Sequence, residues 1–240
     1  GNLGYSYKLN QSVDALVGSE LPKDLVLVGS ALVLSLLIAI PLGVAQAAKR
    51  NSIFDYSGTG LAFLVYSMPS YWLGLLLVAG LAIGVHLFPA DVPQASIGGI
   101  IADPRALVLP VATLTLVYVA MFSRYMRGSV IDTLAEDYIR TAVAKGAPRR
   151  RVLVRHALRN SLIPVATLVG LSVPALLTDG IIVEYVFNFP GIGLTYFNAA
   201  VTSDYPVELG ITVLVGVATV LGNLLADLAY AVLDPRVRYR

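Results

Sequence analysis

Five long stretches of the chain are apolar, and shorter polar segments separate them. An α-helix needs about 20 apolar residues to cross the hydrocarbon core of a bilayer, which is about 30 Å thick. The five stretches are long enough to do so, and their centres carry no Lys, Arg, Asp or Glu. The sequence therefore predicts five transmembrane helices, over residues 24–47, 58–85, 107–127, 161–183 and 207–232.

The composition agrees with a membrane protein. Hydrophobic residues make up 57% of the 240 residues, charged residues only 13%, and the mean hydropathy is +0.76. Soluble domains carry about 25% charged residues. The low charge excludes a disordered chain and an ordinary cytosolic enzyme, and the absence of cysteine excludes a secreted disulfide scaffold. We expect an all-α, polytopic helical bundle that forms a single transmembrane domain over residues 1–240.

The cations are unevenly divided between the two sides of this predicted domain. Only Lys8, Lys23 and Arg105 fall on one side, and the rest of the 17 Lys and Arg residues fall on the other. Because Lys and Arg accumulate in cytoplasmic loops, we expect residues 1–23 to be extracytoplasmic and the C-terminus to be cytoplasmic. The chain then starts outside, at Gly1, without a signal peptide. We therefore expect an earlier helix, and at least six spans in the native protein.

The longest polar segment, residues 128–160, has the pattern of two short helices. Thr133 and Glu136 have the spacing of a capping box, in which a hydroxyl and a carboxylate satisfy backbone groups of the first helical turn. Glu136 and Arg140 are spaced for an i,i+4 ion pair in the favourable order. Gly146 can end this first helix in the left-handed conformation.

The second helix of this segment is strongly basic. Pro148 can open it, because the missing N–H of proline is not needed there. Arg151, Arg155 and Arg159 follow at four-residue spacing, which predicts one basic stripe. Three interpretations fit: a solvated loop that only fixes the orientation, a site for anionic lipid, or a docking element for a cytosolic partner. We favour docking, because a simple anchor needs neither a helix cap nor a glycine corner.

A specific family resemblance is carried by the same segment. It consists of residues 137–146 (DYIRTAVAKG), residues 150–160 (RRVLVRHALRN) and Pro164. This string resembles the EAA loop of type I ABC importer permeases, and in particular that of the peptide-permease branch, the "B" subunits of dipeptide and oligopeptide systems. The chain differs from the general Glu-Ala-Ala…Gly pattern, because the Glu position holds Arg140, as is usual in the peptide branch. The later Leu-Pro is also absent, since Leu158 is followed by Arg and not by Pro.

Four further segments resemble this branch in the same order along the chain. They are residues 1–6 (GNLGYS), residues 183–193 (VEYVFNFPGIG), residues 204–206 (DYP) and residues 233–239 (LDPRVRY). They are similar to the segment after the branch's first helix, to two parts of its last outer loop and to its inner tail. The first match also accounts for the expected missing helix.

The resemblance implies a non-catalytic subunit of a bacterial or archaeal plasma membrane, with the type I ABC permease fold. Such a permease forms half of a pathway, here for short peptides, and pairs with a second, homologous permease, so that a heterodimer is expected. Two cytosolic ATPases bind ATP and Mg, an extracytoplasmic binding protein delivers the substrate, and no nucleic acid is involved. This chain itself is expected to bind no cofactor and no metal. The residues expected to couple it to an ATPase are Glu136, Asp137, Tyr138, Arg140, Thr141, Ala142, Lys145, Gly146, Ala147, Pro148, Arg151 and Arg155.

The residues themselves agree that ATP hydrolysis takes place on another chain. A P-loop needs Gly-Lys-Ser/Thr, and none of the lysines here follows a glycine. The chain has only two histidines, His86 and His156, which makes a histidine-based metal site or catalytic triad improbable.

Several residues near the spans are candidates for lining the pathway, and each also has an ordinary structural interpretation. Aromatic residues flanking Pro69 fit a pathway wall or simple helix packing equally well. The acidic candidates fit an interfacial position or an ion pair with the C-terminal tail, and Arg124 and Arg127 fit snorkelling to the inner interface. The lining candidates are Tyr66, Tyr71, Trp72, Asp179 and Asp227.

Other functions stay open at this point. Relatives of the same branch import nickel, glutathione or other small solutes, and this chain does not determine the substrate. An ion-coupled secondary transporter would need carboxylates in the span centres, which are missing here. A membrane-embedded enzyme is disfavoured by the scarcity of His and Cys and of clustered polar residues in the spans.

Overall fold

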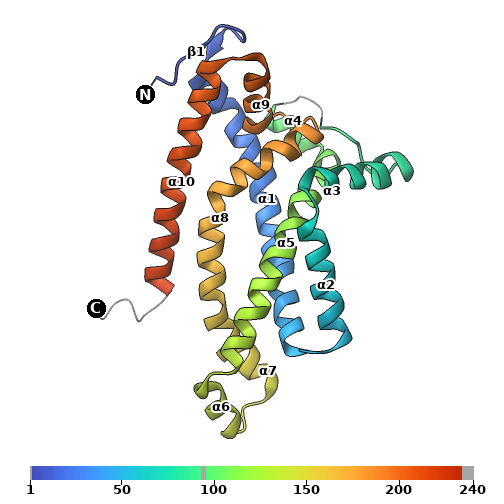
Figure 1. Ribbon diagram of the computed structural model, residues 1–240, viewed down its shortest axis with the longest axis vertical. Helices are drawn as coiled ribbons and strands as arrows, with labels where there is room; N and C mark the ends of the chain where they lie inside the picture. The colour runs from blue at the N-terminus through green and yellow to red at the C-terminus, as the bar shows by residue number, and fades with distance from the viewer. Residues whose placement is uncertain (1, 93–95, 234–240) are drawn as a thin grey trace. The chain divides into compact units, whose positions relative to one another are not determined.

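The computed structural model describes residues 2–92 and 96–233, and for residues 171–179, 225–227 and 229–233 it describes the backbone alone. A short hairpin of β1 (Tyr5–Ser6) and β2 (Gln11–Ser12) precedes a series of helices, which confirms the all-α prediction. The helices, drawn in Figure 1, are α1 (Val13–Ala48), α2 (Ile53–Ser67), α3 (Ser70–Leu77), α4 (Ile97–Ala102), α5 (Pro104–Leu134), α6 (Asp137–Ala144), α7 (Arg149–Arg151), α8 (Leu158–Val186), α9 (Ile192–Thr202) and α10 (Tyr205–Leu233), with π-helical segments η1 (Val78–Gly84) and η2 (Val152–Ala157).

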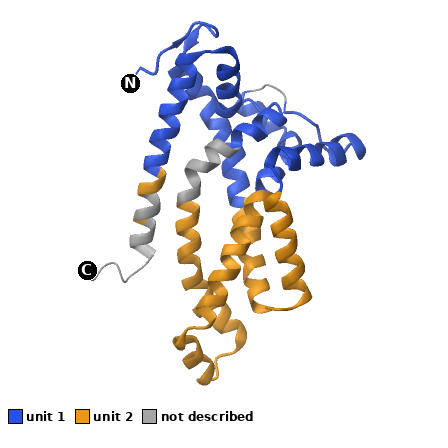
Figure 2. Ribbon diagram, viewed as in Figure 1, with its two compact units in different colours: residues 1–33, 68–115, 173–221 blue, residues 34–67, 116–172, 222–240 orange. Residues whose placement is uncertain are grey.

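The chain divides into two compact units, which Figure 2 colours separately. Unit 1 consists of residues 1–33, 68–115 and 173–221, and unit 2 of residues 34–67, 116–172 and 222–240. Several of the long helices contribute residues to both units.

Unit 1 has an apolar core between α1, α9 and α10. Val13, Ile192 and Val207 are buried in this core. A glycine permits close approach there, since a Cβ at Gly210 would lie 2.6 Å from Cγ1 of Val13. The N-terminal hairpin is tied to the same core by a hydrogen bond from the Ser6 hydroxyl to the Asp204 carboxylate.

Unit 2 contains parts of α1, α5 and α8, together with the whole of α2, α6 and α7. At Gly43, α1 and α5 approach so closely that a Cβ would lie 2.7 Å from both the Ser123 carbonyl oxygen and Cβ of Met126. Small residues let membrane helices pack at such short range. Met126, Val130 and Val165 form the buried cluster beside this contact.

Four of the five predicted spans each lie within one described helix, which extends beyond the span at both ends. Three helices are long and apolar enough to cross a membrane, namely Val13–Ala48, Pro104–Leu134 and Tyr205–Leu224, and a fourth span results if α2, α3 and η1 count as one. The predicted span 161–183 lies within α8, where the side chains of residues 171–179 are outside the described part. Helix α1 begins 11 residues before the predicted start at residue 24, so part of the expected extracytoplasmic segment is helical.

The predicted span over residues 58–85 consists of two helical parts, Ile53–Ser67 and Ser70–Gly84, with a bend of 105° between them. The helix stops at Ser67, and Pro69 is the N-cap of α3, with φ −58° and ψ 138°. Proline lacks the N–H that an α-helix needs and disfavours helical geometry in the residue before it, so the break falls at Met68.

Candidate functional site

The candidate site is the segment between α5 and α8, which comprises α6, α7 and η2 (Figure 1). Helix α6 is amphipathic, and one side of it is buried against the following segment. Ile139 is 3% exposed and packs in a small cluster with Val152 and Ala157. Burial of these residues keeps the two halves of the segment together.

The end of α6 confirms the prediction that Gly146 ends this helix in the left-handed conformation. Its φ is +80°, the left-handed region that glycine adopts without strain. The Gly146 N–H donates to the Val143 carbonyl (2.9 Å), and the Ala147 N–H donates to the Ala142 carbonyl (3.1 Å). These two bonds form a Schellman motif, which satisfies the last carbonyls of the helix and turns the chain sharply. The next helix then starts after Pro148, as predicted, with Pro148 as its N-cap.

The start of α6 does not follow the prediction of a capping box. Thr133 still belongs to α5, and its hydroxyl oxygen accepts a hydrogen bond from Ser161 (2.9 Å). Glu136 is the N-cap of α6 but makes no capping hydrogen bond through its side chain. Arg140 pairs with Asp137 (3.4 Å) instead of Glu136, and both side chains of this pair are largely exposed. The prediction of a capping box is wrong because α5 continues to Leu134, two turns beyond the predicted end of the span at residue 127.

Hydrogen bonds attach this segment to the long helices of unit 2. The Asn160 side-chain amide donates to the Tyr138 hydroxyl (2.7 Å), which joins α8 to α6. The Ser129 hydroxyl donates to the Ser161 carbonyl (3.0 Å), and the Ser161 hydroxyl lies 3.2 Å from the Ser129 carbonyl, which joins α5 to α8. The guanidinium of Arg149 donates to the Ala48 carbonyl at the end of α1. A displacement of this segment would therefore be transmitted to α8 through Tyr138 and to α1 through Arg149, and from α8 to α5.

A groove of about 560 Å³ runs along this segment. Eight of the twelve predicted coupling residues line it, while Glu136, Asp137, Arg140 and Pro148 do not. Its charged lining residues are Lys145, Arg151 and Arg155, without a carboxylate among them, so the groove is positively charged. The complete lining is Tyr138, Thr141, Ala142, Lys145, Gly146, Ala147, Arg151, Arg155 and His156.

The lining includes His156, which sequence reasoning did not place in the site. Residues 152–157 are π-helical, not α-helical. The wider turn brings residues five apart onto the same face, so His156 lies on the face of Arg151. The predicted stripe of Arg151, Arg155 and Arg159 rested on α-helical spacing, and Arg159 does not reach the groove.

The structure gives a specific partner to one arginine that the sequence assigned only to snorkelling. Arg127 forms a bidentate ion pair with Asp55, with Nε–Oδ1 and Nη2–Oδ2 distances of 2.5 and 2.7 Å. Asp55 is 1% exposed and also accepts the Asn51 N–H (3.0 Å). Arg124 stacks over the ring of Phe63, 4.0 Å from its centroid, so its charge faces an aromatic surface.

The pathway candidates are not brought together in one described site. Tyr66 belongs to unit 2, whereas Tyr71 and Trp72 belong to unit 1, and all three side chains are about half exposed. The side chains of Asp179 and Asp227 lie outside the described part of the chain. Pathway lining by these five residues stays a prediction.

Comparison with known proteins identifies a family and several relatives. Residues 39–239 match the family described as "Binding-protein-dependent transport system inner membrane component". A putative peptide permease protein of Brucella suis biovar 1 is 38% identical over 99% of this chain and 76% of its own length. The oligopeptide transport system permease protein AppB of Bacillus subtilis is 38% identical over 95% of this chain and 72% of its own length. The dipeptide transport system permease protein DppB of Escherichia coli K12 is 35% identical over 100% of this chain and 78% of its own length.

Proposed function

Since the chain belongs to the family of binding-protein-dependent transport system inner membrane components, and is therefore a permease subunit of an ABC importer, we propose that it imports short peptides and receives the motion of an ATPase through α6. In this proposal the chain forms half of the pathway and a homologous permease forms the other half. Two ATPases, with ATP and Mg, act on the cytoplasmic side, and a binding protein delivers the peptide on the side of the N-terminus.

The observation that carries the coupling role is the positively charged groove around α6. Most of the predicted coupling residues lie on this one surface. Helix α6 is attached to α8 by Tyr138, and the following α7 is attached to α1 by Arg149. A short helix held in this way acts as a lever: when a partner that grips it moves, the long helices move with it. A solvated loop would not need a buried anchor such as Ile139.

The proposed substrate class follows from the relatives. Proteins named as peptide, oligopeptide and dipeptide permeases share 35–38% identity with almost all of this chain. Nickel, glutathione or another small solute is the second candidate within the same architecture. An ion-coupled secondary transporter has no support from these relatives.

The test of the coupling role is the variant Gly146→Asp in the assembled transporter. A side chain at φ +80° is strained and would disrupt the Schellman corner. We expect the variant to enter the membrane at the normal level, to lose its co-purifying ATPases and to import no labelled dipeptide. Gly128→Asp is the matched control, because a Cβ at Gly128 has no neighbour within 4 Å and its φ is not positive. Normal uptake by Gly146→Asp would refute coupling through α6.

The substrate class is tested separately in wild-type vesicles. Labelled dipeptides and longer peptides are offered together with nickel and glutathione as competitors. Uptake of peptides that neither competitor reduces is the expected result. Uptake of nickel or glutathione without uptake of peptides would assign the second candidate.

A further inference from the structure

The corner between α8 and α9 is buried and contacts several other elements of unit 1. Phe187 and Phe189, which follow α8, are 1% and 0% exposed. The Phe187 carbonyl accepts the Val92 N–H (2.9 Å), and its ring packs so closely on Gly74 of α3 that a Cβ there would lie 3.2 Å from Cε2. The segment from Phe187 to Gly191, called the α8–α9 corner below, therefore joins several elements of this unit.

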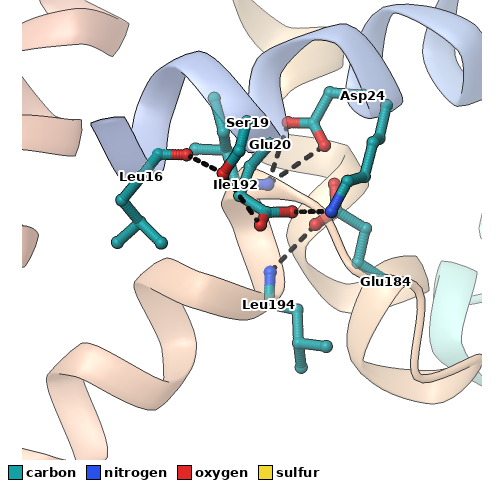
Figure 3. A network of polar contacts seen from close by, with 8 residues as sticks. Leu16, Ser19, Glu20, Asp24, Glu184, Ile192 and Leu194 are labelled. Carbon is teal, nitrogen blue, oxygen red and sulfur yellow. Dashed lines mark hydrogen bonds and ion pairs between the residues drawn. The ribbon is translucent and has the colours of Figure 1, made fainter. Parts of the chain in front are cut away.

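Two buried carboxylates bind the N-terminus of α9, as Figure 3 shows. Asp24 of α1 accepts the Ile192 N–H at both oxygens (3.0 and 3.2 Å), and Oε2 of Glu184 of α8 accepts the Leu194 N–H (2.9 Å). Asp24 is 2% exposed and Glu184 is 1% exposed. The first N–H groups of a helix have no partner within the helix and carry partial positive charge, so they are suited to bind carboxylates.

Two glycines, Gly191 at the end of the corner and Gly193 in α9, provide the room for these carboxylates. A Cβ at Gly191 would overlap Oδ1 of Asp24 and Oε2 of Glu184. A Cβ at Gly193 would lie 2.5 Å from Cα of Ile181 and 2.9 Å from Oε2 of Glu184. Gly191 has φ −120°, a conformation open to any residue, so space and not backbone geometry requires glycine there. The Gly-x-Gly spacing of Gly191 and Gly193 is thus explained by the room that the two acids need.

The charges around the pair do not form a metal site. Lys23 pairs with Glu20 (2.8 Å) beside Asp24, which leaves the α9 amides as the donors to Asp24 and Glu184. Within the described residues, no group of three or more His, Cys, Asp or Glu side chains is arranged to hold a metal ion. Asp24 and Glu184 are better explained as the residues that hold the N-terminus of α9 in place.

Helix α9 depends on such attachment. It has 11 residues, and isolated helices shorter than about 12–15 residues are marginal in water. It also connects α8 to α10, so its position fixes the end of α8 and the beginning of α10 in unit 1. One face of α9 is buried through Ile192 and Ala199, while Val201 on the other face is 69% exposed.

We propose that Asp24 and Glu184 are positioning residues that hold α9 and the α8–α9 corner in one place, and that import requires α9 to be held there. The requirement for import rests on the proposed function. The holding of α9 does not, because it concerns the geometry of this chain alone. Loosening α9 would uncouple the connected ends of α1, α8 and α10 and so prevent these helices from moving together.

The test uses the absence of cysteine in the chain. A spin label on Val201→Cys reports the mobility of α9 in the assembled transporter, and uptake of a labelled dipeptide is measured in the same vesicles. Asp24→Ala and Glu184→Ala remove the acceptors, whereas Asp24→Asn and Glu184→Gln keep one acceptor oxygen each. Asp91→Ala, at an exposed acid of the same unit, is the matched control.

We expect the two alanine variants to mobilise the label and to lower uptake by about tenfold or more, because buried amides lose charged acceptors. The Asn and Gln variants should restore an ordered label and most of the uptake, and the control should behave as wild type. Rescue by these variants separates positioning from a requirement for the charge itself.

Each remaining outcome decides the proposal. An ordered label in the Asp24→Ala, Glu184→Ala double variant overturns the holding of α9, and a mobile label with normal uptake overturns its importance for import. If the double variant does not accumulate, Gly191→Ala is used, since it keeps both carboxylates but displaces them, with Gly29→Ala as control because a Cβ at Gly29 meets nothing within 4 Å. In that case the proposal requires the label to become mobile in Gly191→Ala and to stay ordered in Gly29→Ala. If wild-type vesicles import no peptide, the proposed function fails, while the label still tests the holding of α9.

Discussion

At the scale of single residues, buried carboxylates make the decisive polar contacts in both units. Asp24 and Glu184 bind backbone amides in unit 1, and Asp55 binds Arg127 in unit 2. The sequence did not reveal the contacts of Asp55 and Asp24, because their partners are far apart along the chain: 72 residues separate Asp55 from Arg127, and 168 separate Asp24 from Ile192. Residue type and local spacing carry no information about such pairs.

The Asp55–Arg127 pair leads to a prediction about stability. Asp55→Ala leaves the Arg127 guanidinium without its bidentate partner, and Arg127→Ala leaves an almost fully buried carboxylate unpaired. Each single variant should lose about 2–4 kcal/mol of stability, and the double variant should lose less than the sum of the two. Thermal unfolding in detergent, followed by circular dichroism, measures these differences.

The exposed pair of Asp137 and Arg140 provides the control for this experiment. Both side chains are largely in solvent, so their removal should leave the unfolding temperature unchanged. Additive losses in the Asp55→Ala, Arg127→Ala double variant would show that the two groups do not stabilise one another.

At the scale of elements, the sequence predicted features that depend on neighbouring residues better than features that depend on packing against another helix. The corner at Gly146 was predictable because all the groups involved lie within six residues. The capping box at Thr133 was not, because packing against α8 extends α5 beyond its apolar pattern. The π-helical turn at residues 152–157, which brings His156 into the groove, also has no clear signature in the sequence.

The attachment of α6 gives the prediction at this scale. Ile139→Ala removes the buried side chain that holds α6 against η2, whereas Val143→Ala shortens a side chain on the same helix that is 56% exposed. Truncation of a buried Ile costs about 2–5 kcal/mol, enough to detach so short a helix. We expect faster amide hydrogen exchange over residues 137–146 and reduced peptide-stimulated ATP hydrolysis for Ile139→Ala.

Val143→Ala serves as the matched control and should show neither effect. Unchanged exchange in Ile139→Ala would mean that the hydrogen bond of Tyr138 to Asn160 is sufficient to hold α6. Faster exchange without any change in ATP hydrolysis would show that α6 transmits no motion.

At the scale of the whole molecule, the apolar pattern predicted the approximate place of the long helices. Of the five predicted spans, the described residues show three that qualify by length and hydropathy, or four if α2, α3 and η1 count as one. The pattern could not predict the break at Pro69, because a proline inside an apolar run is tolerated in some membrane helices and ends others. Nor could it predict the division into two units, since this depends on contacts between segments that are distant in sequence. The orientation in the membrane rests on the distribution of Lys and Arg alone.

This orientation can be tested directly, because every introduced cysteine would be the single one in the chain. Tyr7, in the N-terminal hairpin, is 85% exposed, and Ile53, the first residue of α2, is 87% exposed. With the N-terminus outside, a membrane-impermeant maleimide should label Tyr7→Cys in intact cells, and Ile53→Cys only after permeabilisation. The two sites are matched in exposure, so a difference between them reports the side of the membrane and not accessibility within the fold. Labelling of Ile53→Cys but not Tyr7→Cys in intact cells would invert the topology. The basic groove around α6 would then face away from any cytosolic ATPase, and coupling through it would be impossible.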